Sequence, residues 1–155
     1  MYTTVLTLHS WLRWIALVAG VAATVATMAT PRDRSGPSGT SRADRWGFAL
    51  MMTLDVQMLL GLLLYLVVSP NMAEIRANFG AAMKDPASRF WAVEHITMMV
   101  GAVIMVHAGR VLARKAASAE AKRMWLFASF GIATVLMFLA IPWPGTRAGR
   151  PLFRI

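Results

Sequence analysis

The stretch Trp14–Thr30 reads WIALVAGVAATVATMAT, carries no charged side chain, and has threonine as its only polar residue type. A helix that crosses the hydrocarbon core of a bilayer needs roughly 20 predominantly apolar residues. Extended back to Thr4, the segment reaches this length, with His9 and Arg13 as its ionisable residues. We therefore expect a transmembrane helix over about residues 4–30.

Three further segments are also predominantly apolar and about 20 residues long, at about residues 46–68, 90–111 and 124–143. The chain has 155 residues, of which 57% are hydrophobic and 15% are charged. Soluble domains have about 25% charged residues and lack several long apolar runs. The residues between Pro31 and Ser41 are rich in Pro, Gly, Ser and Arg, which is typical of a polar loop. We expect one all-α domain, an integral membrane four-helix bundle.

The connection over residues 69–89 is the longest one. Apolar residues recur in it at helical spacing, opposite a polar face: Met72, Ile75, Phe79 and Met83 against Glu74, Arg76 and Asn78. This pattern indicates a short amphipathic helix at about residues 72–83, lying in the membrane interface. An irregular loop with scattered apolar residues is the alternative.

The basic residues stand at the ends of the apolar segments. They form no basic, aromatic-rich face, so the net charge of +9 points to lipid contact rather than to nucleic acid. The first and third connections hold nine of the 16 Lys and Arg residues, and the other side holds seven. This bias predicts both termini on the outer (periplasmic) side of a bacterial inner membrane. The absence of cysteine excludes disulfides, thiolate metal sites and covalent c-type haem.

Ionisable groups inside spans are costly and mark functional candidates. His9 lies about five residues into the first span, and His95 about five residues into the third span from the same side, so both lie about 7–8 Å deep. Two imidazoles at one depth on different helices can bind the two faces of one haem iron. Hydrogen bonds between helices are the alternative role. His107 has no second histidine at its own depth, so a second bis-histidine haem is excluded.

Other polar residues extend this candidate site. Arg13 lies one turn deeper than His9, while Arg89 and Arg150 lie near the outer surface, where any of them can pair with haem propionates. After Arg13 the same face of the first helix carries only small residues, which allow close helix packing or leave room for a flat ligand: Ala16, Gly20, Ala23 and Thr27.

Asp55 and Gln57 lie near the middle of the second span and point about 200° apart, so they cannot share a partner. Asp55 is expected to be protonated, or paired with Arg13 or a histidine. With Glu94, these residues are candidates for proton transfer or quinone contact. A buried hydrogen bond between helices is the competing role for Asp55.

Three segments carry a resemblance to a known group: Leu8–Trp14 (LHSWLRW), Arg89–His95 (RFWAVEH), and the tail with Pro142–Pro144 (PWP) and Gly149–Phe153 (GRPLF). In these segments the chain resembles small bacterial four-helix membrane proteins labelled cytochrome b-like. The resemblance covers nearly the whole chain. It implies one b-type haem with histidine ligands, which fall on His9 and His95.

Two classes of function follow. The first is electron transfer through one haem b near the outer face, with quinol or a larger respiratory or photosynthetic complex as partner. The second is a non-catalytic accessory subunit that packs against other membrane subunits or a second copy of itself. A further option for an accessory subunit is pigment binding, with His9 or His107 as the ligand of the magnesium in the pigment. The sequence contains no motif of a stand-alone soluble enzyme.

Overall fold

The computed structural model describes residues 1–29 and 41–153, and within these ranges the chain is helical and has no β-strand. Four described segments are long and apolar enough to cross a membrane: Tyr2–Ala29, Arg42–Val68, Pro86–Arg114 and Ala119–Ala140. The expected all-helical fold with membrane-spanning helices is confirmed at this level of length and composition. The predicted polar loop over residues 31–41 lies, apart from Ser41, outside the described ranges.

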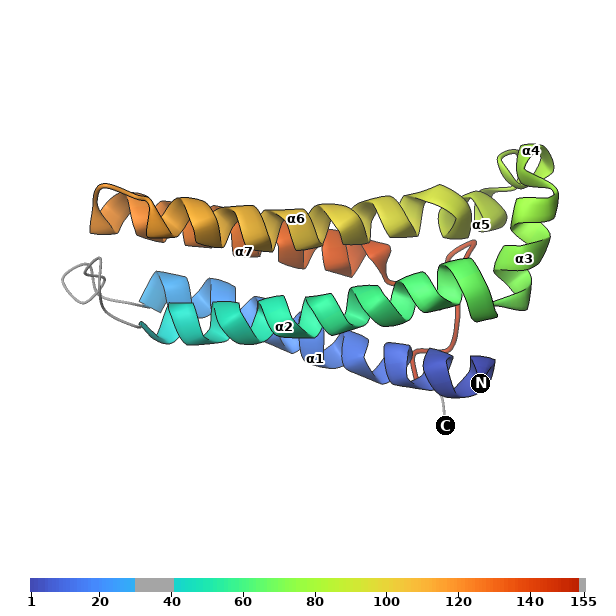
Figure 1. Ribbon diagram of the computed structural model, residues 1–155, viewed down its shortest axis with the longest axis horizontal. Helices are drawn as coiled ribbons and strands as arrows, with labels where there is room; N and C mark the ends of the chain where they lie inside the picture. The colour runs from blue at the N-terminus through green and yellow to red at the C-terminus, as the bar shows by residue number, and fades with distance from the viewer. Residues whose placement is uncertain (30–40, 154–155) are drawn as a thin grey trace.

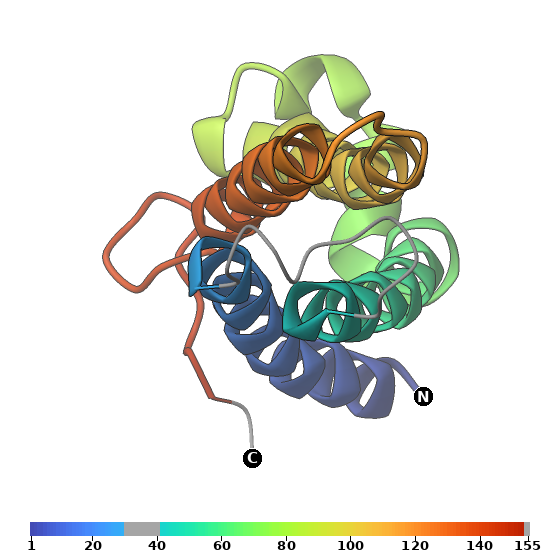
Figure 2. The same ribbon diagram turned by 90° about the vertical axis from the view of Figure 1, so that its left-hand side faces the viewer.

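The long helices α1 (Tyr2–Ala29), α2 (Arg42–Leu63), α6 (His95–Arg114) and α7 (Ala119–Ala140) lie side by side along the long axis of the molecule. In Figure 1 α1 and α2 form one layer and α6 and α7 the other, and the view along the bundle in Figure 2 shows the two layers packed against each other. The N-terminus, the tail after α7 and the connection between α2 and α6 gather at one end, which we call the pocket end. The opposite end, where α6 joins α7, is the far end.

At the pocket end, α2 and α6 each change to a π-helical turn. These segments are η2 (Leu64–Val68), which continues α2, and η3 (Phe90–Glu94), which leads into α6 at His95. The Tyr65 hydroxyl of η2 donates a hydrogen bond of 2.7 Å to the Ala92 carbonyl of η3. Such bulges alter the direction of the side chains that follow and are frequent at functional sites. The η3 turn lies directly before His95, and the Tyr65 hydrogen bond joins it to η2.

The connection between η2 and η3 is helical and divided. It consists of α3 (Pro70–Ala77), α4 (Phe79–Ala82) and α5 (Pro86–Arg89), so the helix expected at residues 72–83 is interrupted at Asn78, where ψ is 50°. Met72 and Ile75 of α3 are buried and pack with Ala92 of η3. The connection therefore covers the pocket end of the bundle.

Local capping explains where the elements begin and end. Asp85 accepts a hydrogen bond of 2.8 Å from the Ser88 amide, with Pro86 at the first helical position, which starts α5 before the predicted third span. Ser118 caps α7, and this helix ends at Ala140 rather than at the predicted residue 143. The reason is Pro142, which favours an extended conformation at Ile141, where ψ is 128°.

The small-residue face of α1 is buried, and at Gly20 it packs against α7 and α2. Ala16, Gly20, Ala23 and Thr27 are all buried, and a Cβ atom added at Gly20 would lie 2.7 Å from the Met137 side chain. Large side chains from the other helices complete this core: Leu50, Leu54, Val106 and Phe130. Within the membrane, where no hydrophobic drive joins helices, such close contact provides the packing attraction.

The far end carries an ionic contact between layers. Lys122 of α7 donates a hydrogen bond of 3.0 Å to Asp44 of α2, and both side chains are largely buried. Asp44 also forms a capping box with Ser41 at the start of α2, and its carbonyl accepts from Arg110 of α6 at 3.1 Å. One carboxylate thus links the start of α2 to the other layer.

Candidate functional site

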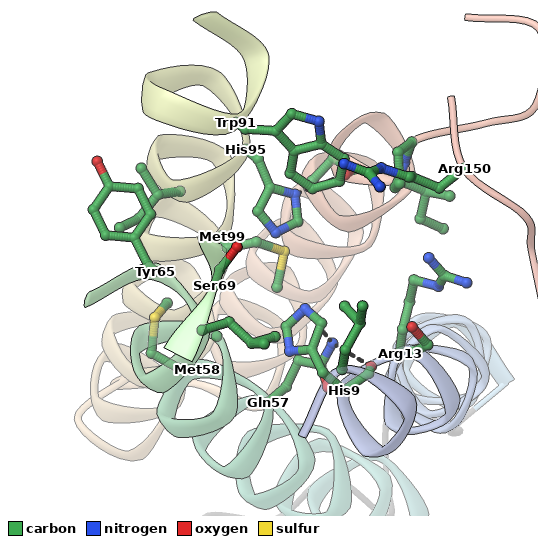
Figure 3. A pocket seen from close by; sticks show the side chains of 18 of the residues that line it. His9, Arg13, Gln57, Met58, Tyr65, Ser69, Trp91, His95, Met99 and Arg150 are labelled. Atoms are coloured by element: carbon green, nitrogen blue, oxygen red, sulfur yellow. Dashed lines mark hydrogen bonds between the residues drawn. The ribbon is translucent and has the colours of Figure 1, made fainter. Parts of the chain in front are cut away.

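A cavity lies inside the pocket end, with walls from all the long helices and from the tail. Its volume is about 140 Å³ and its walls are mainly apolar. Figure 3 shows its polar and sulfur-containing lining, which includes His9, Arg13, Gln57, Met58, Tyr65, Ser69, Trp91, His95, Met99 and Arg150. The two histidines predicted as ligands therefore line the same cavity.

His95 is held in one orientation by the end of α7. Its Nδ1 atom lies 2.9 Å from the Ala140 carbonyl oxygen, which can only accept, so Nδ1 carries the hydrogen. Aromatic rings of η3 pack around the imidazole, with the Trp91 centroid at 5.5 Å and the Phe90 centroid at 5.9 Å. The other ring nitrogen, Nε2, keeps its lone pair. This is the arrangement by which proteins prepare a histidine for a metal.

His9 faces the cavity from α1. Its ring lies against Gly61 of α2, where an added Cβ atom would stand 3.3 Å from the ring carbon Cε1. Gln57 donates a hydrogen bond of 3.0 Å to the His9 carbonyl, and its amide nitrogen lies 3.4 Å from His9 Nε2. His9 Nδ1 is buried and has no hydrogen-bond partner among the described residues. A buried imidazole nitrogen without a partner is costly. Because the Gln57 amide nitrogen can only donate, Nδ1 carries the ring hydrogen, and it binds a metal only after this hydrogen leaves or moves to Nε2.

The separation of the two imidazoles fits axial coordination. Their ring centroids are 6.3 Å apart with planes at 64°, and Figure 3 shows the rings approaching from opposite walls of the cavity. A metal–nitrogen bond of about 2 Å, with the ring centre about 1 Å beyond the nitrogen, places two trans imidazole centroids about 6 Å apart. The observed distance is close to this value.

The volume of the cavity is a stricter test of whether a haem fits between the two histidines. Pockets that enclose ligands of drug size measure about 300–1,000 Å³, so a macrocycle needs these walls to move apart. Met58, Met99 and Met137 line the cavity, and flexible methionine side chains adapt readily to a new shape. The centroid separation therefore matches two imidazoles on one metal ion, whereas the cavity as it stands is too small for a haem macrocycle.

The predicted arginines differ in position. Arg13 and Arg150 line the cavity; Arg13 donates a hydrogen bond of 2.7 Å to the Leu152 carbonyl, and Arg150 lies over the Trp91 ring at 5.4 Å. Arg89 does not line it, because it forms a salt bridge of 2.8 Å with Glu94 on the exposed surface. The structure therefore brings two of the three predicted arginines, and not Glu94, to the site.

Asp55 and Gln57 have different partners, as their opposite directions on α2 require. Gln57 lies beside His9, whereas Asp55 pairs with His107 of α6 at 2.8 Å. Of the partners expected for Asp55, a histidine is the one found. The pair lies outside the cavity, on the face where α2 and α6 meet.

Within the described ranges, no three His, Asp or Glu side chains gather as a metal-binding group. Haem requires only axial ligands from the protein, because the porphyrin supplies the equatorial nitrogens. Comparison with known proteins finds no matching family model, no matching curated protein and no matching solved structure. The resemblance to cytochrome b-like proteins therefore stays a prediction.

The sequence analysis assigned no role to several features of the site. The acceptor for His95 is a backbone carbonyl, and the space for His9 depends on Gly61, which is one glycine among several in apolar runs. Tyr65, with its hydrogen bond between the two π-helical turns, was also missed. Its signal is that a tyrosine inside a span must find a partner for its hydroxyl.

Proposed function

We propose that this chain is a small membrane electron carrier that binds one haem b between His9 and His95. The observation that carries the proposal is the pair of converging imidazoles from α1 and α6, at a centroid separation of 6.3 Å. Bound between two histidines, haem supplies one-electron chemistry without an open coordination position for oxygen. Electron transfer is therefore favoured over oxygen activation.

The residues around the pair have separate roles. The Ala140 carbonyl holds the Nδ1 hydrogen of His95, and Gly61 leaves space for the His9 ring. Arg13 and Arg150 place positive charge at the cavity wall, where they would pair with the haem propionates. The walls are mainly apolar, and such surroundings limit the access of solvent to a redox group.

We place the protein in a bacterial inner membrane with both termini on the outer side, as the distribution of Lys and Arg favours. In that orientation the cavity lies near the outer surface, since the pocket end carries the termini. The partner is then quinol, or a larger complex that meets this half of the bundle.

The test is a reduced-minus-oxidised spectrum of the protein purified from a host with ample haem. The wild-type chain should show the sharp α band of a low-spin b-type haem. His9→Ala and His95→Ala should each remove this band, because each deletes one axial ligand. His107→Ala is the matched control, since this third histidine lies outside the cavity and should leave the band unchanged.

Two results would contradict the proposal. Absence of the band in wild-type protein, with haemin added to the purified sample as well, would exclude a haem site. Retention of low-spin haem in His95→Ala would exclude the proposed ligand pair. In the first case the accessory-subunit role, with packing against other membrane proteins as its function, takes precedence.

A further inference from the structure

Asp55 and His107 form a polar pair at an unusual place. Asp55 lies at the centre of the span Arg42–Val68, and its Oδ1 atom is 2.8 Å from His107 Nε2. The side chains are 35% and 46% exposed, so the pair faces the lipid-accessible surface and is not enclosed by the bundle. Ionisable groups at this depth are costly unless they have partners.

The pair satisfies only part of its hydrogen-bonding capacity. Each side chain uses one atom for the mutual contact, and the structure gives no other hydrogen bond for either side chain within the described residues. The second carboxyl oxygen of Asp55 and Nδ1 of His107 remain available, one as an acceptor and the other as a donor or acceptor according to the tautomer. In the hydrocarbon region of a bilayer, where water is scarce, a lipid-soluble molecule can supply a partner for these atoms.

The surroundings of the pair are apolar and open. Val56 and Leu59 on α2 and Ile104 on α6 are 45%, 67% and 57% exposed. A ligand that suits this surface is soluble in the bilayer and carries groups that form hydrogen bonds. Quinones meet both conditions, because they reside in the hydrocarbon region and their carbonyl or hydroxyl groups accept or donate hydrogen bonds.

We infer that Asp55 and His107 form a headgroup site for a lipid-soluble quinone on the surface of the bundle where α2 and α6 meet. One quinone oxygen would bond to His107 Nδ1 and the ring would lie against the neighbouring apolar side chains. Asp55 also lies two residues from Gln57, about 3 Å along the helix axis, and Gln57 contacts His9. A role for this quinone as electron partner of the haem rests on the proposed function; the binding site does not.

The test is photolabelling in lipid nanodiscs with an azido-quinone, with decyl-ubiquinone as competitor and peptide mapping as the readout. We expect saturable labelling on the peptides that contain residues 55 and 107. Asp55→Leu and His107→Leu should each weaken it by about tenfold, the effect of removing one hydrogen-bond partner and leaving the other polar atom unpaired. Val135→Ala, on the exposed surface of α7 and away from the proposed site, is the control and should label like the wild type.

Labelling that is not saturable, or that persists unchanged in both leucine variants, would overturn the inference. So would labelling concentrated on the peptides that line the His9–His95 cavity. A wild-type dimer that does not label and that becomes monomeric in His107→Leu would show that a second copy covers the pair instead. The haem band recorded on the same samples separates the two proposals, since labelling without the band retains the quinone site and removes the electron carrier.

Discussion

At the scale of single residues, the site depends on the space around His9. Gly61 provides this space because it has no side chain, and the nearest ring atom would be 3.3 Å from an added Cβ. The branched side chain of valine would extend further toward the imidazole and displace it from its present position. The ring position is therefore set from α2 as well as from α1.

We predict that Gly61→Val lowers haem binding by about tenfold or more, as loss of support for a metal ligand does. Titration of the purified protein with haemin measures this affinity. Gly101→Val is the control, because its first added carbon meets only the end of the Leu136 side chain at 3.4 Å and the position lies outside the cavity. Equal affinities for the two variants would show that Gly61 has no role in placing His9.

Helical geometry explains why Asp55 and Gln57, which are close in sequence, contact different helices. Asp55 and Gln57 are two positions apart, yet one contacts His107 and the other His9. Their directions on the helix differ by about 200°, so helical geometry alone separates them. The identity of each partner depends on which helix packs against each face.

At the scale of elements, the start of α2 depends on Asp44. Its carboxylate closes the capping box with Ser41 and accepts from Lys122 of α7 at 3.0 Å. Removal of this group leaves an amide at the start of α2 and a largely buried ammonium without these acceptors. One side chain thus stabilises a helix start and the contact between layers.

We predict that Asp44→Ala lowers the free energy of unfolding by about 2 kcal/mol, from the lost cap and the unpaired Lys122. Unfolding by sodium dodecyl sulfate in mixed micelles measures this quantity. Glu74→Ala on the exposed face of α3 is the control and should unfold like the wild type. If the two variants prove equally stable, the Asp44–Lys122 contact does not join the layers.

At the scale of the whole molecule, the arrangement of polar groups is asymmetric. The histidine pair, the cavity and the covering helices α3 to α5 lie at the pocket end, while the far end has the Asp44–Lys122 contact. If the pocket end faces outward, the cavity lies beside partners at the outer surface. Orientation therefore decides which carriers reach the proposed haem.

We predict that alkaline phosphatase fused after Phe153 is active in a bacterial host, because this enzyme folds only outside the cytoplasm. The same fusion in the turn between α6 and α7, at residues 115–118, should be inactive. Assays of phosphatase activity, with immunoblots to match expression, make the comparison. The reverse pattern would place the pocket end in the cytoplasm and refute the orientation read from the charges.

The sequence alone determined the helical, membrane-spanning character of the chain, because an apolar run of bilayer length has few alternatives to a helix. It also indicated the equal depth of His9 and His95, since helix rise converts residue number into depth. It could not determine which faces meet, because inside lipid all apolar faces are nearly equivalent and close packing decides between them.

The tertiary structure alone decided the remaining features. These are the Ala140 carbonyl that orients His95, the π-helical turns at the pocket end, and the pairing of Asp55 with His107. The first and the last depend on atoms from helices that are distant in sequence, and the π-helical turns are backbone geometry that the side-chain pattern does not reveal. Apolar stretches such as the one from Trp14 thus predict a chain that lies in a membrane. The packing of the helices against one another determines what the polar groups can bind.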